Sequence, residues 1–228
     1  MGHQQNITRI KAVYNALEEI AKEVVFVGGA TVSLYADRPA VETRPTDDID
    51  IMVEVVGYSE YAQIEEKLRS KGFTNDQTSR VICRYQVRGI TVDVMPTDQT
   101  ILGFSNRWYK AAFATSIDIL IDGDYSFRIL RPDYFIATKL EAFKGRGKND
   151  GRTSSDFEDI IHVLNNRTTI WDEIQQAEEE LRHYFTKSFA GLLQNPYLEE
   201  WIMANLEYHE RNRVEYIVRG LKGITATA

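Results

Sequence analysis

The chain changes character once, close to residue 130, and this change constrains the fold more than any other feature of the sequence. Before it, short apolar or alternating runs that predict strands are interspersed with helical patterns. After it, one helical pattern follows another to the end of the sequence. Strands gathered in one part of a chain and helices in the other are typical of an α+β protein. We therefore expect a mixed sheet with flanking helices in residues 1–130 and a helical bundle in residues 131–228.

Individual elements are predicted from the period of their apolar residues. The spacing from Ile7 to Ala21 predicts an opening amphipathic helix. Further helices are expected at 30–35, 59–71 and 133–144, the last with Pro132 in its first turn. Strands are expected at 24–27, 48–53, 81–87, 90–95, 117–121 and 125–130. Turn residues at Arg88-Gly89 and at 122–124 predict two hairpins.

Composition excludes several classes of protein. Of 228 residues, 43% are hydrophobic and 27% charged, so the chain can bury a core and is neither disordered nor fibrous. A single cysteine, Cys83, excludes an internal disulfide and a cysteine-rich zinc module. The sequence has neither a long apolar run nor a secretory leader, and we expect a cytosolic protein with no membrane partner. The net charge of −7 argues against nonspecific nucleic-acid binding, although residues 126–152 are locally basic.

A Gly-Gly pair follows the first predicted strand. Gly28 and Gly29 come directly after Val24–Val27 and before a predicted helix. Glycines let a phosphate approach the backbone, and the start of a helix favours negative charge. This arrangement predicts a phosphate contact, but a glycine pair after a strand is also an ordinary structural turn.

Paired carboxylates lie on the next predicted strand. In a strand, side chains two residues apart share a face, so Asp48 and Asp50 project together while Ile49 and Ile51 enter the core. Two adjacent carboxylates repel unless a cation neutralises them or one is protonated. Oxygen ligands of this kind suit Mg²⁺, which is often held by one or two carboxylates and the phosphates of a substrate. The alternative is an acidic edge strand facing solvent.

A third carboxylate, Asp93, lies within the apolar run Ile90–Met95. It shares a face with Thr91 and Met95, and a carboxylate in so apolar a strand needs a partner. If this strand lies beside the strand of Asp48 and Asp50, three carboxylates converge on one site and could hold Mg²⁺ or Mn²⁺. The alternative is a carboxylate on the surface of a hairpin.

Taken together, these motifs resemble a known fold. Val27-Gly28-Gly29, then Asp48-Ile49-Asp50, then a third aspartate on a later strand is similar to the nucleotidyltransferase fold of the DNA polymerase β superfamily. The stretches 44–51 (Arg-Pro-Thr-Asp-Asp-Ile-Asp-Ile) and 131–143 look most like AbiEii/AbiGii-type toxins. In that family a lysine-bearing helix precedes an Asp-x-x-Asp helix, which here matches Lys139 and Asp156 to Asp159.

The resemblance implies an enzyme that transfers NMP from an NTP to an acceptor hydroxyl, with release of pyrophosphate. It implies catalytic roles for Asp48, Asp50, Asp93, Lys139 and Asp156, with Asp159 an alternative to Asp156. The three strand aspartates would bind the metal. Nucleotide contacts are expected from Gly28, Gly29, Thr31, Arg44, Thr46 and Lys139.

The resemblance also implies a biological role. The protein would be the toxin of a toxin–antitoxin or phage-defence pair, acting on tRNA 3′ ends or on a protein, with a cognate antitoxin as partner. Transfer to a small molecule such as an aminoglycoside is the alternative reaction, because those nucleotidyltransferases share a similar Gly-Gly and Asp-Ile-Asp pattern. The alternative outside the enzymes is a catalytically silent nucleotide-binding module, since Gly29 stands where the superfamily often has serine.

Overall fold

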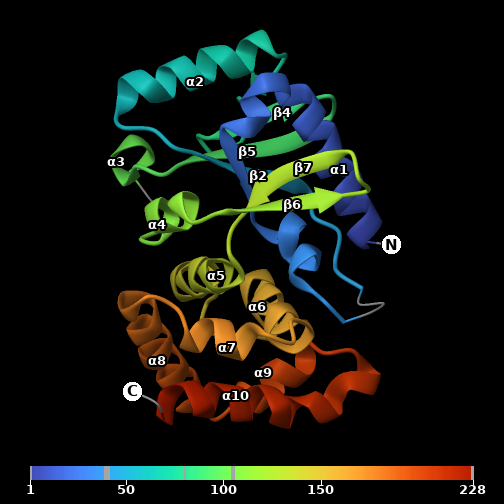
Figure 1. Cartoon of the computed structure of the whole chain (residues 1–228), viewed down its shortest axis with the longest axis vertical. Helices are drawn as coiled ribbons and strands as arrows, with labels where there is room; N and C mark the ends of the chain where they lie inside the picture. Colours follow the sequence, from blue (N-terminus) through green and yellow to red (C-terminus); the bar gives the residue numbers. More distant parts are fainter. Residues whose placement is uncertain (1, 39–41, 80, 104–105, 227–228) are drawn as a thin grey trace. The chain divides into compact units, whose positions relative to one another are not determined.

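The structure is a computed structural model that describes residues 2–38, 42–79, 81–103 and 106–226 (Figure 1). Its contacts divide the chain into two compact units. The first, here called the sheet unit, comprises Met1–Ser33 and Glu42–Arg131, and the second, the helical unit, comprises Leu34–Val41 and Pro132–Ala228. The division at Arg131 lies one residue beyond the expected boundary, and the segment Leu34–Val41 is grouped with the helices.

The sheet unit is built on one seven-stranded mixed sheet, in the order β3-β4-β5-β2-β1-β7-β6. β2 pairs with β5, and β1 with β7, in parallel; the other neighbours are antiparallel. The strands are β1 (Val24–Val27), β2 (Asp48–Val53), β3 (Thr74–Asn75), β4 (Arg84–Val87), β5 (Ile90–Pro96), β6 (Ile117–Ile121) and β7 (Tyr125–Ile129). A mixed sheet followed by helices confirms the predicted α+β class.

Helices flank this sheet, and α1 contacts β2 and β5. The α-helices of the sheet unit are α1 (Gly2–Leu17), α2 (Tyr58–Ser70), α3 (Gln99–Leu102) and α4 (Tyr109–Ala114). The 3₁₀-helices are η1 (Glu18–Lys22) and η2 (Gly29–Tyr35), the second of which ends in the helical unit. β1 is buried along its whole length, as its apolar sequence requires, and Phe26 packs on Phe127 with ring centroids 5.2 Å apart.

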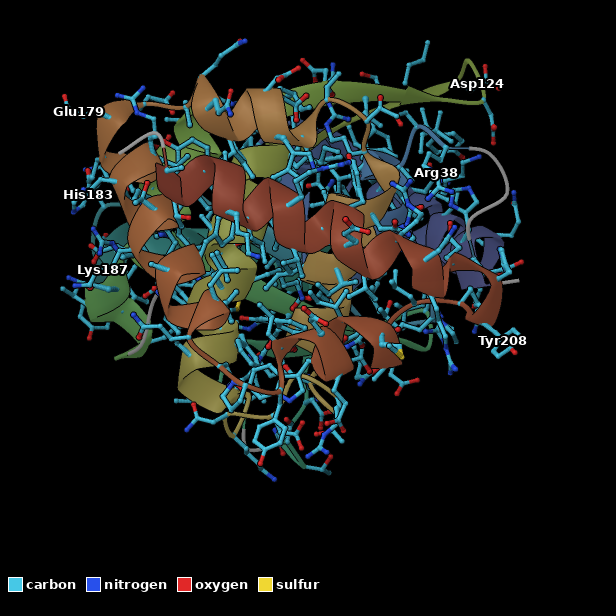
Figure 2. All side chains as sticks on the ribbon, turned by 90° about the horizontal axis from the view of Figure 1, so that it is seen from below. Arg38, Asp124, Glu179, His183, Lys187 and Tyr208 are labelled. Carbon is cyan, nitrogen blue, oxygen red and sulfur yellow. The ribbon has the colours of Figure 1, made fainter. Side chains whose placement is uncertain are left out.

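The helical unit contains six α-helices and one 3₁₀-helix within the described residues. These are α5 (Pro132–Arg146), α6 (Ser155–Asn166), α7 (Ile170–Gln175), α8 (Glu179–Leu193), α9 (Leu198–Ala204), η3 (Tyr208–Arg213) and α10 (Val214–Ala226). α5 contacts α6, and α10 contacts α7, α8 and α9 (Figure 1). α8 buries Phe185 and Phe189, whereas Glu179, His183 and Lys187 lie along its outer edge (Figure 2). This division is the amphipathic pattern of a bundle helix.

Some predicted boundaries were wrong, for local reasons. The opening helix ends at Leu17 rather than residue 21, because Glu18 adopts a positive φ of 52° and the chain continues as a 3₁₀-helix. The fourth strand begins at Arg84 rather than Val81, because Val81–Cys83 form a turn in which the Arg84 amide donates to the Val81 carbonyl. Ile82 is exposed there, so the apolar run does not report a buried strand. Within the described residues, no helix is both long and apolar enough to cross a bilayer.

Candidate active site

The three strand aspartates lie on one face of the sheet. In the parallel pair β2–β5, Asp50 lies directly opposite Asp93, and Asp48 lies opposite Thr91. Directly opposite residues on strands about 4.8 Å apart share a face, and so do residues two apart on one strand. The other face carries Ile49, Ile51, Val92 and Val94, all fully buried. The structure therefore brings Asp48, Asp50 and Asp93 together.

The Arg84 side chain joins this group from the neighbouring strand. Arg84 on β4 lies opposite Asp93 in the antiparallel ladder, so it faces the same side of the sheet. Its Nε donates to Asp93 Oδ1 at 2.7 Å, and its Nη2 donates to Asp93 Oδ2 at 2.7 Å and to Asp48 Oδ2 at 3.0 Å. This is a two-pronged carboxylate contact with a third bond across to the next strand. Arg84 was not among the site residues predicted from the sequence.

Electrostatics at this face follow from these contacts. The hydrogen bonds that Arg84 donates to the Asp93 carboxylate raise the pKa of Arg84 above its ordinary value, so the guanidinium stays charged. Burial raises the pKa of the adjacent Cys83 thiol to about 12, and the negative charge of Asp93 adds to this effect. Cys83 is therefore a protonated thiol at neutral pH and a poor nucleophile.

Gly28 makes the close approach of Asp50 feasible. It lies at the end of β1, where Val27 is opposite Asp50, and has φ of +72°. A Cβ at this position would lie 2.7 Å from Cγ of Asp50 and closer still to Oδ2. Glycine is thus required at position 28 by its backbone conformation and by contact. The predicted glycine turn is next to the predicted carboxylates.

Two other predicted nucleotide contacts, Thr31 and Thr46, are held by hydrogen bonds within the sheet unit. Gly29 begins η2, and the fully buried Thr31 donates its hydroxyl to the Gly28 carbonyl at 2.9 Å, which stabilises the turn. Thr46 is buried, and its backbone amide donates to Asn6 Oδ1 at 3.0 Å.

Asn6 also fixes the chain that leads into β2. Its side-chain amide donates to the Arg44 carbonyl at 3.1 Å, and Arg9 donates to the Thr46 carbonyl. The α1 residues therefore hold the segment that precedes Asp48 in place. Asn6 was not predicted from the sequence, where its only signal was an amide side chain on the apolar side of the opening helix.

Lys139 and Asp156 belong to the helical unit. Lys139 on α5 is buried, and its Nζ lies 3.0 Å from Asp156 Oδ1 and 2.7 Å from Asp159 Oδ2. Arg146 also contacts Asp156, through Nε at 2.6 Å and Nη2 at 2.8 Å. The structure therefore brings both candidate acids, Asp156 and Asp159, to the same ammonium group.

The pKa values of this buried cluster follow from its charges. Burial alone lowers the pKa of Lys139, but the carboxylates of Asp159 and Asp156 outweigh it and raise the pKa. Burial likewise raises the pKa of Asp156, and the cations Arg146 and Lys139 reverse this and lower it. Both groups are therefore ionised at neutral pH.

The donors on the sheet face suit a divalent cation by their chemistry. Asp48, Asp50 and Asp93 are hard oxygen ligands on neighbouring strands, and the three carboxylates and Arg84 carry a formal charge of −3 + 1 = −2. In residues 2–38, 42–79, 81–103 and 106–226, however, no three His, Cys, Asp or Glu side chains stand in a metal-binding arrangement. Arg84 occupies oxygens of two of the three carboxylates.

Comparison with known proteins identifies the fold. No family model matches the sequence, and no curated protein matches it. Among solved structures, an antigenic nucleotidyltransferase-like protein from Paracoccidioides brasiliensis is 18% identical, with a TM-score of 0.55 over 92% of this chain and 99% of that one. The antibiotic-resistance factor ANT(2'')-Ia is 16% identical, with a TM-score of 0.52 over 84% and 96%. These similarities show a nucleotidyltransferase-like fold.

Proposed function

We propose that this protein is a metal-dependent nucleotidyltransferase that moves NMP from an NTP to an acceptor hydroxyl. The observation that carries the proposal is the row of Asp50 and Asp93, with Asp48 beside it, on one face of β2 and β5. Gly28 and its turn lie at the end of the neighbouring strand. The likeness of 84% to 92% of the chain to nucleotidyltransferase-like folds supports the same activity.

In the proposed reaction, the acceptor oxygen forms a bond to the α-phosphorus of the NTP. The bond from that phosphorus to the oxygen bridging the β-phosphate breaks, and pyrophosphate leaves. Asp48, Asp50 and Asp93 would hold Mg²⁺ or Mn²⁺, which supplies neutralisation of phosphate charge. The remaining work of the chain is positioning, as in other phosphoryl transfers, with the glycine turn admitting the phosphates close to the backbone.

Lys139 is proposed as a cation for the triphosphate, and Asp156 or Asp159 as the acid that positions it. In this role the Lys139 ammonium would be shared between phosphate and the carboxylates of Asp156 and Asp159, which already lie within 3.0 Å of it. A lysine held in this way is oriented before ligand binds, and its charge is secured by the same contacts.

For the acceptor, the first candidate is a cellular macromolecule. The AbiEii-type motif around Asp48 and the helix of Lys139 support a toxin that modifies tRNA 3′ ends or a protein and is neutralised by a cognate antitoxin. The basic stretch 126–152 supports an anionic acceptor. Growth arrest on induction, without any antibiotic, is the expected result.

The second candidate is a small hydroxylated molecule such as an aminoglycoside. The fold similarity to the antibiotic-resistance factor ANT(2'')-Ia, which spans 84% of this chain, favours it. Resistance to an added aminoglycoside without growth arrest is the result expected of this candidate.

The direct test is transfer of label from an α-labelled NTP in the presence of Mg²⁺ and either total RNA, cell lysate or an aminoglycoside. Asp48→Ala and Asp50→Ala should each abolish transfer to the acceptor that the wild type labels. Asp47→Ala is the matched control, because Asp47 is the adjacent exposed carboxylate outside β2. Transfer that is equal in all four proteins contradicts the proposal. Nucleotide binding without pyrophosphate release on any acceptor indicates a silent binding module instead.

A further inference from the structure

The cluster on this face of the sheet consists of Asp48, Asp50, Asp93 and Arg84, and the proposed reaction does not use Arg84. Its guanidinium makes three hydrogen bonds, two to Asp93 and one to Asp48, at 2.7 to 3.0 Å. A quarter of the side chain is exposed, whereas the Asp93 side chain is only 9% exposed. Arg84 is therefore partly exposed to solvent, and its guanidinium contacts the more deeply buried Asp93.

The contact with Arg84 reduces the repulsion among the three carboxylates that share this face of the sheet. Register alone places Asp48, Asp50 and Asp93 on one face, and ionised carboxylates so close together destabilise one another without a cation. Arg84 is held opposite Asp93 by the same ladder, through the pairs Arg84–Asp93, Tyr85–Val92 and Val87–Ile90. The fold thus supplies one permanent positive charge to the group.

The same contact obstructs a metal ion. Nη2 of Arg84 bonds to one oxygen of Asp48 and one of Asp93, so it lies between the two carboxylates. A cation that bridges those two oxygens, at about 2.0 to 2.6 Å from each, would occupy the same space as this nitrogen. The guanidinium and a bridging ion therefore exclude each other unless Arg84 moves.

We propose that Arg84 is a built-in counter-cation of the carboxylate site, which competes with the divalent cation for Asp48 and Asp93 and weakens its binding. Arg84 is a positioning residue in this proposal: it keeps the carboxylates together before metal binds and must turn away from Asp48 when metal enters. The inference rests on the proposed cation site at Asp48, Asp50 and Asp93.

A purely structural role makes a different prediction. If Arg84 only holds β4 to β5, its removal lowers stability and leaves cation affinity unchanged. If it competes, its removal tightens cation binding, because the ion no longer displaces a bonded guanidinium. A hydrogen bond to a charged group is worth about ten- to a hundredfold in an equilibrium constant, and this sets the size of the expected effect.

The experiment is a calorimetric titration of the full-length, metal-free chain with Mn²⁺ alone, without nucleotide. Arg84→Gln should bind Mn²⁺ at least about tenfold more tightly than the wild type. Arg88→Asn is the matched control, because it removes the same charge from the exposed turn of the same hairpin, where φ of +50° suits asparagine. Its Mn²⁺ affinity should equal that of the wild type.

Equal or weaker Mn²⁺ binding by Arg84→Gln overturns the inference. If Asp48→Asn still abolishes Mn²⁺ binding in that case, the proposed function survives. Absence of Mn²⁺ binding in both the wild type and Arg84→Gln overturns the cation site and the inference with it. If Arg84→Gln does not fold, Arg84→Lys replaces it, since an ammonium is a point charge that cannot form the two-pronged contact. Tighter binding than wild type is again expected, and unchanged binding again overturns the inference.

Discussion

Replacement of Gly28 by alanine tests the most demanding contact of the candidate site. Two costs are expected. An L-residue at φ of +72° costs about 1–2 kcal/mol relative to glycine. The added Cβ would also lie 2.7 Å from Cγ of Asp50, which forces Asp50 or the ends of β1 and β2 to move. Overpacking of this kind costs about 1–3 kcal/mol. We therefore expect Gly28→Ala to lower the free energy of unfolding by about 2–5 kcal/mol in total.

A matched substitution separates the two costs. Gly123, in the β6–β7 turn, has φ of +76°, and within the described residues nothing lies within 4 Å of a Cβ built there. Gly123→Ala should therefore lose only the conformational part, about 1–2 kcal/mol. Any gain from a less flexible unfolded chain is shared by both variants and cancels in the comparison. Urea denaturation followed by circular dichroism measures both losses.

A double-mutant cycle then assigns the difference to Asp50. In an Asp50→Ala background the contacts of the new Cβ with Oδ2 and Cγ disappear, and only the contact with Cβ of residue 50, at 3.0 Å, remains. Gly28→Ala should therefore cost less there than in the wild type and approach the cost of Gly123→Ala. Residues in direct contact give coupling energies of about 0.5–3 kcal/mol in such cycles. If Gly28→Ala and Gly123→Ala lose equal stability in the wild-type background, or if the cycle shows no coupling, the argument from close approach is refuted.

Two further predictions concern the helical unit. Lys139→Met should lower the free energy of unfolding by about 3–5 kcal/mol in urea denaturation, because it removes the ammonium that Asp156 and Asp159 share, and only Asp156 keeps its contact with Arg146 among these pairs. The half-exposed Lys144 is the control, and Lys144→Met should lower the free energy of unfolding by less than about 1 kcal/mol. Equal losses in the two variants would count against the ion-pair argument. Burial lowers the pKa of His162 to about 4 from 6.5, against the opposing charges of Asp159 and Glu210. The unfolded chain therefore binds the proton first as pH falls, and stability should decline between pH 6.5 and 4 by up to about 3 kcal/mol. His162→Gln should flatten that part of the stability profile, and an unchanged profile would exclude His162 as its source.

Local patterns in the sequence predicted the strands that form the site. β1, β2 and β6 have the predicted bounds, because a short apolar run or a strict alternation of apolar and polar residues indicates a strand. The Arg88-Gly89 turn was also predicted, and both residues adopt the positive φ of a two-residue hairpin. Such a turn pairs Val87 with Ile90 and hence Arg84 with Asp93. The signal that identifies Arg84 was therefore present in the sequence, because Arg84–Asp93 is the fourth residue pair from the predicted turn.

Other parts of the site depend on contacts that no local pattern reports. The parallel pairing of β2 with β5 joins segments about forty residues apart. The sequence did not predict this pairing, and the convergence of Asp93 with Asp48 and Asp50 was expected only if the two strands were neighbours. The approach of Asp50 to Gly28 depends on the antiparallel pair β1–β2. The pairing of Lys139 with both Asp156 and Asp159 depends on how α5 packs on α6. Each is a tertiary choice among several that the same patterns allow.

The apolar face of β2 and β5 explains why the carboxylate group should tolerate chemical substitution. Ile49, Ile51, Val92 and Val94 are fully buried, and a shift of one residue in register would exchange them with the aspartates. Burial of these four side chains therefore fixes the polar face, independently of the charges on it. Neutral variants such as Asp48→Asn keep this packing and relieve repulsion within the group. Loss of nucleotide transfer in such a variant, with unfolding stability equal to or above that of the wild type, would then report on chemistry rather than on folding.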